Sequence, residues 1–391
     1  MTEIICQVAG IFLIGLNFKN QPFNQSRIQL HSNQLNKMTL EALGYNNELE
    51  HYRQEQHLDT FEVGRVISEH RERYVVKTAE GEFDAELIGN LRYSAQERAG
   101  FPVVGDWVAI QVYDEHKALI HALFPRKNRI ERRAVGKHGE KQIIAANIDY
   151  AFIVQAVGWD FSINRIERYL TICNASGVEP IILLNKIDLI SEPELEALVE
   201  SVRARAGEVP VIPISNETRK GYPELNQWIK EGKTYCLLGS SGVGKSTLIN
   251  NLSGRQLMKT NAISESTQKG RHVTSHRELV VLPGGGILID NPGMREVGIA
   301  DPGSGLEMTF SAIAELSEHC RFKDCTHTNE PGCAILAAVE SGELDENALD
   351  NYRKMEREKE HYESTVAERR RKDKAFGKMV RSIMKNKKKE K

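Results

Sequence analysis

Cysteine is scarce in this sequence, with six residues in a chain of 391. Three of them, Cys6, Cys173 and Cys236, stand singly among apolar residues, as buried free thiols usually do. The other three are clustered near residue 325. This clustering favours a metal site over a set of disulfides.

A long apolar run is also missing. The stretch Ile4–Leu16 is apolar for about a dozen residues, which is too short to span a bilayer. The only charged residue before this stretch is Glu3, so the basic start of a secretory signal is absent. The sequence therefore predicts a cytoplasmic protein that is not bound to a membrane.

Net charge is small as well, at -2, but it hides an asymmetry at the C-terminus. From Glu368 onward only Glu368, Asp373 and Glu390 are acidic, whereas the basic residues are Arg369, Arg370, Arg371, Lys372, Lys374, Lys378, Arg381, Lys385, Lys387, Lys388, Lys389 and Lys391. Such a tail suits a polyanion such as RNA. A merely solvated or disordered tail is the alternative.

What the sequence does contain is a phosphate-binding pattern. An apolar run, Tyr235–Leu238, leads into Gly-Ser-Ser-Gly-Val-Gly-Lys-Ser and then into a helical pattern, which fits G-x-x-x-x-G-K-[ST]. Backbone amides of such a loop surround phosphates, the lysine reaches the β and γ oxygens, and the serine hydroxyl binds Mg²⁺. An ordinary Gly/Ser turn is the alternative. The predicted nucleotide-binding residues are Gly239, Ser240, Ser241, Gly242, Val243, Gly244, Lys245, Ser246 and Thr247.

A second pattern specifies the base. Asn185, Lys186, Ile187 and Asp188 directly follow a predicted strand and match N-K-x-D. A carboxylate at Asp188 accepts two hydrogen bonds from the N1–H and 2-amino groups of guanine, whereas adenine would leave it unpaired. One strand later, Ser215 stands where GTPases carry a second guanine-side loop, usually Ser-Ala, but the next residue departs from that pattern.

A third pattern, D-x-x-G, begins at Asp290 and ends at Gly293. Its aspartate would hold Mg²⁺ through water, and the Gly293 amide would sense the γ-phosphate. The same residues also make a good turn. Position 294 is Met294, which cannot orient an attacking water, so slow intrinsic hydrolysis and activation by a partner are expected.

The cysteine cluster reads Cys-x4-Cys-x-His-x5-Cys and supplies Cys320, Cys325, His327 and Cys333. Three thiolates and one imidazole make a closed tetrahedral set for a structural Zn²⁺ ion. His319 is a competing ligand, but it directly precedes Cys320.

Length and pattern together predict a multi-domain protein. Residues 1–57 are predicted to be an N-terminal extension that need not be ordered, with Met38 resembling a normal start. Five short strands then predict an OB-like β-barrel over 58–125, followed by a basic linker over 126–146. Alternating strands and helices predict an α/β GTPase domain over 147–300, and residues 301–391 are predicted to be a helical zinc-binding domain with a basic tail.

The order of the motifs is unusual, because N-K-x-D precedes the phosphate loop whereas ordinary GTPases have the reverse order. This is a circular permutation of the GTPase domain. The permuted order, the barrel before it and the cysteine cluster after it resemble the ribosome small subunit-dependent GTPase A family of bacteria, from about Leu58 to the C-terminal helices.

The resemblance implies a function and further site residues. It implies a GTPase that binds the small (30S) ribosomal subunit and its rRNA and hydrolyses GTP during late subunit maturation, stimulated by the subunit. The stretch with Gly270, His272 and Thr274 is similar to that family's G-x-H-T-T segment, although Val273 replaces a threonine. By this resemblance Thr274 completes the Mg²⁺ shell and His272 is the catalytic candidate; the alternative is that His272 only contacts nucleotide or RNA.

The expected cofactors are GTP or GDP with Mg²⁺ and one structural Zn²⁺. The protein is expected to be a monomer. Two other functions stay open at this stage. One is an RNA-binding zinc protein in which nucleotide is mainly structural. The other is a P-loop ATPase or small-molecule kinase, against which Asp188 argues.

Overall fold

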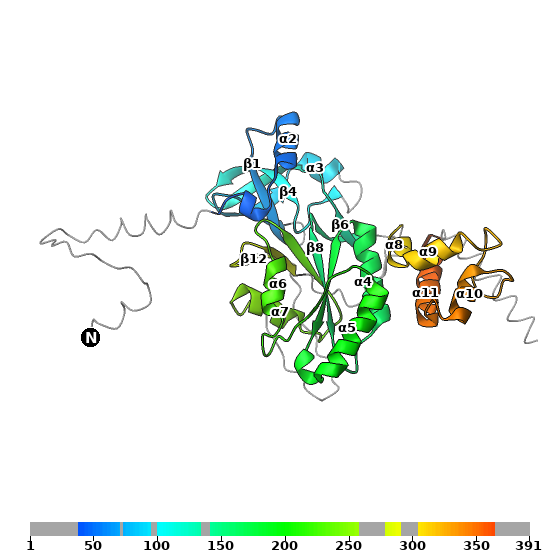
Figure 1. Cartoon of the computed structure of the whole chain (residues 1–391). Helices are drawn as coiled ribbons and strands as arrows, with labels where there is room; N and C mark the ends of the chain where they lie inside the picture. Colours follow the sequence, from blue (N-terminus) through cyan, green and yellow to red (C-terminus); the bar gives the residue numbers. More distant parts are fainter. Residues whose placement is uncertain are drawn as a thin grey trace, which may run out of the picture. The chain divides into compact units, whose positions relative to one another are not determined.

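The computed structural model describes residues 38–70, 73–94, 100–133, 141–257, 278–290 and 304–363 (Figure 1). The predicted positions His272, Thr274, Gly293 and Met294 lie outside these residues, as does the basic tail.

The first described elements are two short helices within the predicted N-terminal extension. They are η1 (Glu41–Leu43) and α2 (Asn47–Glu55). Asn46 caps α2 by accepting a hydrogen bond from the Leu49 amide, a common N-cap arrangement. Leu43 is fully buried and Tyr45 packs edge-on against Trp107, so this part of the extension is ordered because it covers the barrel.

Five strands form the predicted barrel. They are β1 (Glu62–His70), β2 (Arg73–Lys77), β3 (Glu82–Leu87), β4 (Trp107–Asp114) and β5 (Lys117–Leu123), with the helix α3 (Gly89–Ser94) after β3. The strands pair in the order β1-β2-β3-β5-β4, and β1 also pairs with β4, which closes the barrel. Side chains at alternate positions, such as Val66, Val76 and Ile120, fill its interior.

The segment 126–146, predicted to be a linker, contains a two-stranded antiparallel ribbon. Its strands are β6 (Arg129–Arg133) and β7 (Lys141–Ala146). Ile130 in β6 is fully buried, while Arg129 and Glu131 on either side of it form an ion pair. Because charged residues lie on both sides of Ile130, the sequence of β6 does not show the apolar alternation that predicts a strand.

The α/β domain is built on six strands in the order β10-β9-β8-β11-β13-β12. Its elements are β8 (Tyr150–Ala156), α4 (Ile163–Ser176), β9 (Glu179–Asn185), η3 (Ile187–Leu189), α5 (Glu192–Ala206), β10 (Val211–Pro213), α6 (Tyr222–Trp228), β11 (Thr234–Leu238), α7 (Lys245–Ser253), β12 (Glu278–Val281) and β13 (Ile287–Asp290). All pairings are parallel except that of β12 with β13. One further antiparallel pair, Ser68 with Glu278, joins β12 to β1 of the barrel.

Helices cover both faces of this sheet, as expected for parallel strands (Figure 1). One face packs against α4 and α5 through residues such as Leu170 and Val202. The other packs against α6 and α7 through residues such as Leu225 and Leu248. The sheet edge at the carboxyl ends of the parallel strands is therefore left for ligands.

The C-terminal helices are α8 (Gly305–Thr309), α9 (Ser311–Ser317), α10 (Ala334–Ser341) and α11 (Glu346–Glu363). They pack on α4. A Cβ atom at Gly305 would lie 2.6 Å from the Thr171 carbonyl oxygen, so α8 approaches α4 more closely than a larger residue allows. None of the described helices is long and apolar enough to cross a membrane.

Candidate nucleotide and metal sites

The phosphate loop lies between β11 and α7, at the carboxyl edge of the sheet. Gly239, Gly242 and Gly244 all have positive φ angles, of 147°, 81° and 101°. A Cβ atom at Gly239 would approach the Val154 carbonyl oxygen to 2.3 Å, so this position requires glycine for space as well as for conformation. The Lys245 ammonium group donates to two carbonyl oxygens of the loop, those of Gly239 and Ser240, at 2.6 and 2.5 Å.

The predicted base-recognition residues lie at the same edge, because β9 and β11 both run parallel to β8. Asn185 is fully buried at the end of β9, and its Nδ2 donates to the Val243 carbonyl oxygen at 2.7 Å. Lys186 adopts a left-handed conformation with φ of 66°, which turns the chain sharply after the strand. Asn185 therefore connects the base loop directly to the phosphate loop.

Asp188 and Ser215 come together although they follow different strands. The Ser215 hydroxyl donates to Asp188 Oδ1 at 2.5 Å and accepts from the Thr218 amide. Ile187 is buried, whereas Asp188 is exposed. Ser215 fixes one carboxylate oxygen, so the Asp188 carboxylate is oriented at an accessible surface.

The remaining described candidates complete this edge. Ser246 and Thr247 occupy the first turn of α7, where unpaired amides favour anions. Asp290 ends β13, the strand on the other side of β11.

The motifs do not include Arg165, which contacts the phosphate loop, or Asp160, which contacts Arg165. Arg165, in the first turn of α4, donates from Nη1 to the Ser240 hydroxyl oxygen at 2.8 Å. Both of its terminal nitrogens also contact the Asp160 carboxylate at 3.0 Å, and these hydrogen bonds lower the pKa of Asp160. Neither residue belongs to a motif, because the contact depends on where α4 begins relative to β11.

The cysteine cluster brings its four ligand atoms within 4.8 Å of one another. The Cys320 and Cys333 sulfurs are 3.9 Å apart, and they lie 3.6 and 3.5 Å from His327 Nδ1. Tetrahedral Zn²⁺, with bonds of about 2.3 Å to sulfur and 2.0–2.1 Å to nitrogen, requires S···S near 3.8 Å and S···N near 3.5 Å. The donor set of all four residues, and the spacing of Cys320, His327 and Cys333, therefore fit Zn²⁺.

Surrounding residues hold the turn that carries His327, whose φ is 56°. The Glu330 carboxylate accepts hydrogen bonds from the Thr326 and Thr328 amides and from the Thr326 hydroxyl, which lowers its pKa. The Arg353 guanidinium group donates to the His327 carbonyl oxygen. The chain thus fixes the ligand loop with its own hydrogen bonds.

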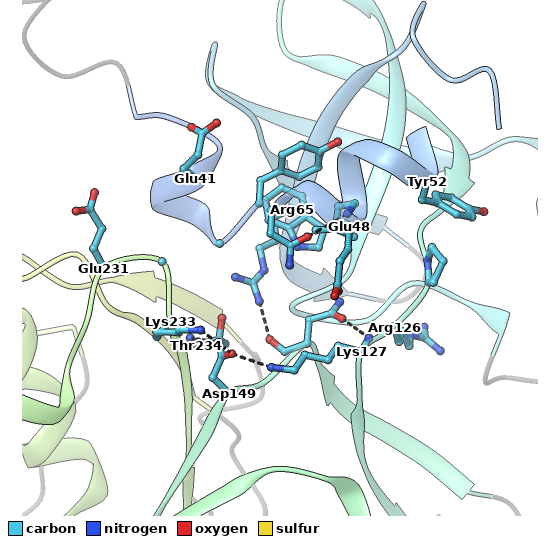
Figure 2. A pocket seen from close by; sticks show the side chains of 18 residues that line it. Glu41, Glu48, Tyr52, Arg65, Arg126, Lys127, Asp149, Glu231, Lys233 and Thr234 are labelled. Atoms are coloured by element: carbon cyan, nitrogen blue, oxygen red, sulfur yellow. Dashed lines mark hydrogen bonds and ion pairs between the residues drawn. The ribbon is translucent and has the colours of Figure 1, made fainter. Parts of the chain in front are cut away.

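A cavity of about 650 Å³ lies at the opposite edge of the sheet, where β8 and β11 begin (Figure 2). Arg65, 1% exposed, reaches from β1 and donates to the carbonyl oxygens of Leu43, Gly105 and Asn147. Burial lowers the pKa of Arg65 to about 10. Asp149 accepts from Lys127 across the same cavity. These contacts join the barrel to the α/β domain away from the candidate nucleotide site.

Comparison with known proteins gives consistent matches. The family model described as RsgA GTPase matches residues 123–300. A curated relative from Opitutus terrae, named small ribosomal subunit biogenesis GTPase RsgA, is 41% identical over 82% of this chain and 90% of its own. Another from Bacteroides thetaiotaomicron, named small ribosomal subunit biogenesis GTPase RsgA 1, is 37% identical over 91% of this chain and 99% of its own.

Two solved structures have a similar fold. YjeQ from Thermotoga maritima superposes with a TM-score of 0.58 and 27% identity over 76% of this chain and 98% of that one. YloQ, described as a circularly permuted GTPase, gives a TM-score of 0.56 at 24% identity, over 79% of this chain and 99% of that one. The second likeness concerns the fold alone.

Proposed function

The chain is a member of the RsgA family of small ribosomal subunit biogenesis GTPases, and we propose that it binds GTP and Mg²⁺ at the carboxyl edge of its α/β sheet. The observation that carries this proposal is the direct hydrogen bond between the base loop and the phosphate loop, from Asn185 to Val243. The base-recognition motif and the phosphate motif are thereby held next to each other.

Guanine recognition rests on Asp188. Its carboxylate accepts from the N1–H and 2-amino groups of guanine, and Ser215 holds it in place. Adenine has an acceptor at N1 and no 2-amino group, so it leaves the carboxylate unpaired and is rejected. This argues against the ATPase and small-molecule kinase alternatives, and competition between GTP and ATP tests the point.

The phosphates bind along the loop from Gly239 to Gly244 and at the start of α7. Backbone amides surround them, and Lys245 exchanges its two carbonyl contacts for β and γ oxygens. The Ser246 hydroxyl and Thr274 would hold Mg²⁺, with Asp290 acting through a water molecule, and the Gly293 amide would sense the γ-phosphate. The metal ion neutralises charge on the phosphate oxygens when it is bound.

Hydrolysis depends on a partner. Met294 cannot orient the attacking water, so we assign that role to His272 and the stimulation of turnover to the small ribosomal subunit. The rRNA of that subunit attracts the basic tail, and the protein acts as a cytoplasmic monomer. Replacing His272 with Ala should abolish the stimulated part of turnover and leave GTP affinity unchanged.

Zn²⁺ bound by Cys320, Cys325, His327 and Cys333 has a structural role here. These four side chains would fill all four positions of a tetrahedral ion and would leave no position for a substrate water.

GTP turnover measured with and without purified small subunits, over a series of salt concentrations, tests the proposal. We expect stimulation by subunits that falls steeply as salt rises, because contacts to rRNA release counterions. Lys245→Ala is the control that should lose nucleotide. Nucleotide binding without any stimulation would favour the alternative, an RNA-binding zinc protein in which nucleotide is mainly structural.

A further inference from the structure

Asn216 occupies the position after Ser215, where the sequence departs from the small residue usual in GTPases. Each of its four polar atoms has a partner. The backbone amide donates to Asn185 Oδ1 at 3.2 Å, and the backbone carbonyl accepts from Asn251 Nδ2 at 2.9 Å. The side chain donates from Nδ2 to the Gly244 carbonyl oxygen at 2.8 Å and accepts at Oδ1 from the Tyr222 hydroxyl at 2.9 Å.

The chemistry of the neighbours fixes the orientation of this side chain. A carbonyl oxygen only accepts, so the atom that faces Gly244 must be the nitrogen of the Asn216 amide. The Tyr222 hydroxyl donates to Oδ1 and itself accepts from Asn251 Nδ2 at 2.8 Å. In this network, which runs from Asn251 on α7 to Gly244, every donor therefore faces an acceptor.

Asparagine side chains thus hold two successive carbonyl groups of the phosphate loop. Asn185 holds that of Val243, and Asn216 holds that of Gly244. In a trans peptide the C=O and the following N–H point in opposite directions. The Gly244 carbonyl also accepts from the Leu248 amide in the first turn of α7, at 2.9 Å. Because Asn216 and Leu248 both hold this carbonyl, the Lys245 amide of the same peptide points to the opposite side.

We infer that Asn216 is a positioning residue for nucleotide binding, which orients the Gly244–Lys245 peptide so that the Lys245 N–H faces the phosphates. This inference rests on the proposed function of the loop. An alanine or serine at 216 cannot reach the Gly244 carbonyl in this way. The fit is also tight, since a Cβ atom at Gly244 would lie 2.7 Å from Asn216 Nδ2.

Asn216→Asp tests the role with little change in volume. The carboxylate still accepts from Tyr222, but it places an acceptor against the Gly244 carbonyl oxygen. We expect the dissociation constants for GDP and GTP to rise by the same factor, about tenfold or more, because the negative carboxylate repels the Gly244 carbonyl oxygen. Asn216→Ala should raise both about two- to tenfold, as the loss of one hydrogen bond does.

Tyr222→Phe is the matched control, since it removes the partner of Oδ1 and keeps the donor to Gly244. It should change both affinities less than Asn216→Ala does. In turnover stimulated by subunits, Asn216→Ala should raise KM by the factor seen in binding and leave kcat unchanged, because the Lys245 amide contacts phosphate before and during reaction. Melting temperature and zinc content verify that each variant is folded.

The outcomes separate this inference from the proposed function. If Lys245→Ala abolishes binding while both Asn216 variants bind within twofold of the parent, Asn216 has no positioning role. A fall in kcat at constant KM would also refute it. If Lys245→Ala binds nucleotide normally, the proposed phosphate site itself is wrong.

Discussion

Removing the metal from the cysteine cluster should unfold the C-terminal helices and leave the nucleotide site intact. Structural Zn²⁺ contributes about 10–16 kcal/mol in small zinc domains at neutral pH. A folded unit of the size of residues 304–363 is stable by only about 3–9 kcal/mol in total. The metal contribution exceeds that stability, so we expect the metal-free helices to unfold even though α8 and α11 pack on α4.

Cys333→Ser isolates the role of the metal. Cys333 has two functions, because its sulfur is a candidate ligand and also caps α10 by accepting from the Leu336 amide. Serine is a good N-cap, so the substitution retains the cap and removes the thiolate. Cys173→Ser is the matched control: that thiol is fully buried in α4, burial raises its pKa, and it lies outside the cluster.

The assay combines zinc content, far-ultraviolet circular dichroism, limited proteolysis and GDP affinity. We expect zinc loss, reduced helix signal and cleavage within 304–363 for Cys333→Ser and for the parent treated with chelator, at an unchanged GDP affinity. Cys173→Ser should retain its zinc. The reasoning is wrong if a zinc-free protein keeps the helix signal and protease resistance of the parent.

Three further substitutions test individual contacts. Asp188→Asn should weaken GTP binding about a hundredfold or more, since hydrogen bonds to a charged group contribute about 1.5–3 kcal/mol each; equal affinity would remove Asp188 from the base site. Arg65→Leu should lower the free energy of unfolding by about 3 kcal/mol or more, because three carbonyl groups lose their donor, and a urea midpoint equal to that of the parent would contradict this. Glu358→Ala should cost no more than about 1 kcal/mol, because its pair with Arg168 is about one-third exposed; a larger loss in the same titration would show that this ion pair anchors α11.

Local sequence signals predicted several elements well. Helix α5 is an example, because Ser191 and Glu194 form a capping box before it and Gly207 follows its last turn. The five barrel strands were also expected, since short alternating segments bounded by turn residues indicate strands. These features depend on residues that are neighbours in the chain.

Features that depend on distant residues were not predictable. Leu43 and Tyr45 gave no sign of order, because the surface that they cover belongs to the barrel. Asn216 was noted only as a departure from a motif, since its partners Gly244 and Asn251 come from the other loop of the site. Arg165 was missed for the same reason.

The strand order of the α/β domain has a consequence for synthesis of the chain. Strands β8, β9 and β10 are made first and pair side by side, so the loops that follow Asn185 and Pro213 can form before the phosphate loop has been translated. Strand β11 is made later and joins the other edge of β8. A growing chain therefore assembles its base-recognition half first, and nucleotide can stabilise the fold only after β11 and α7 have been added.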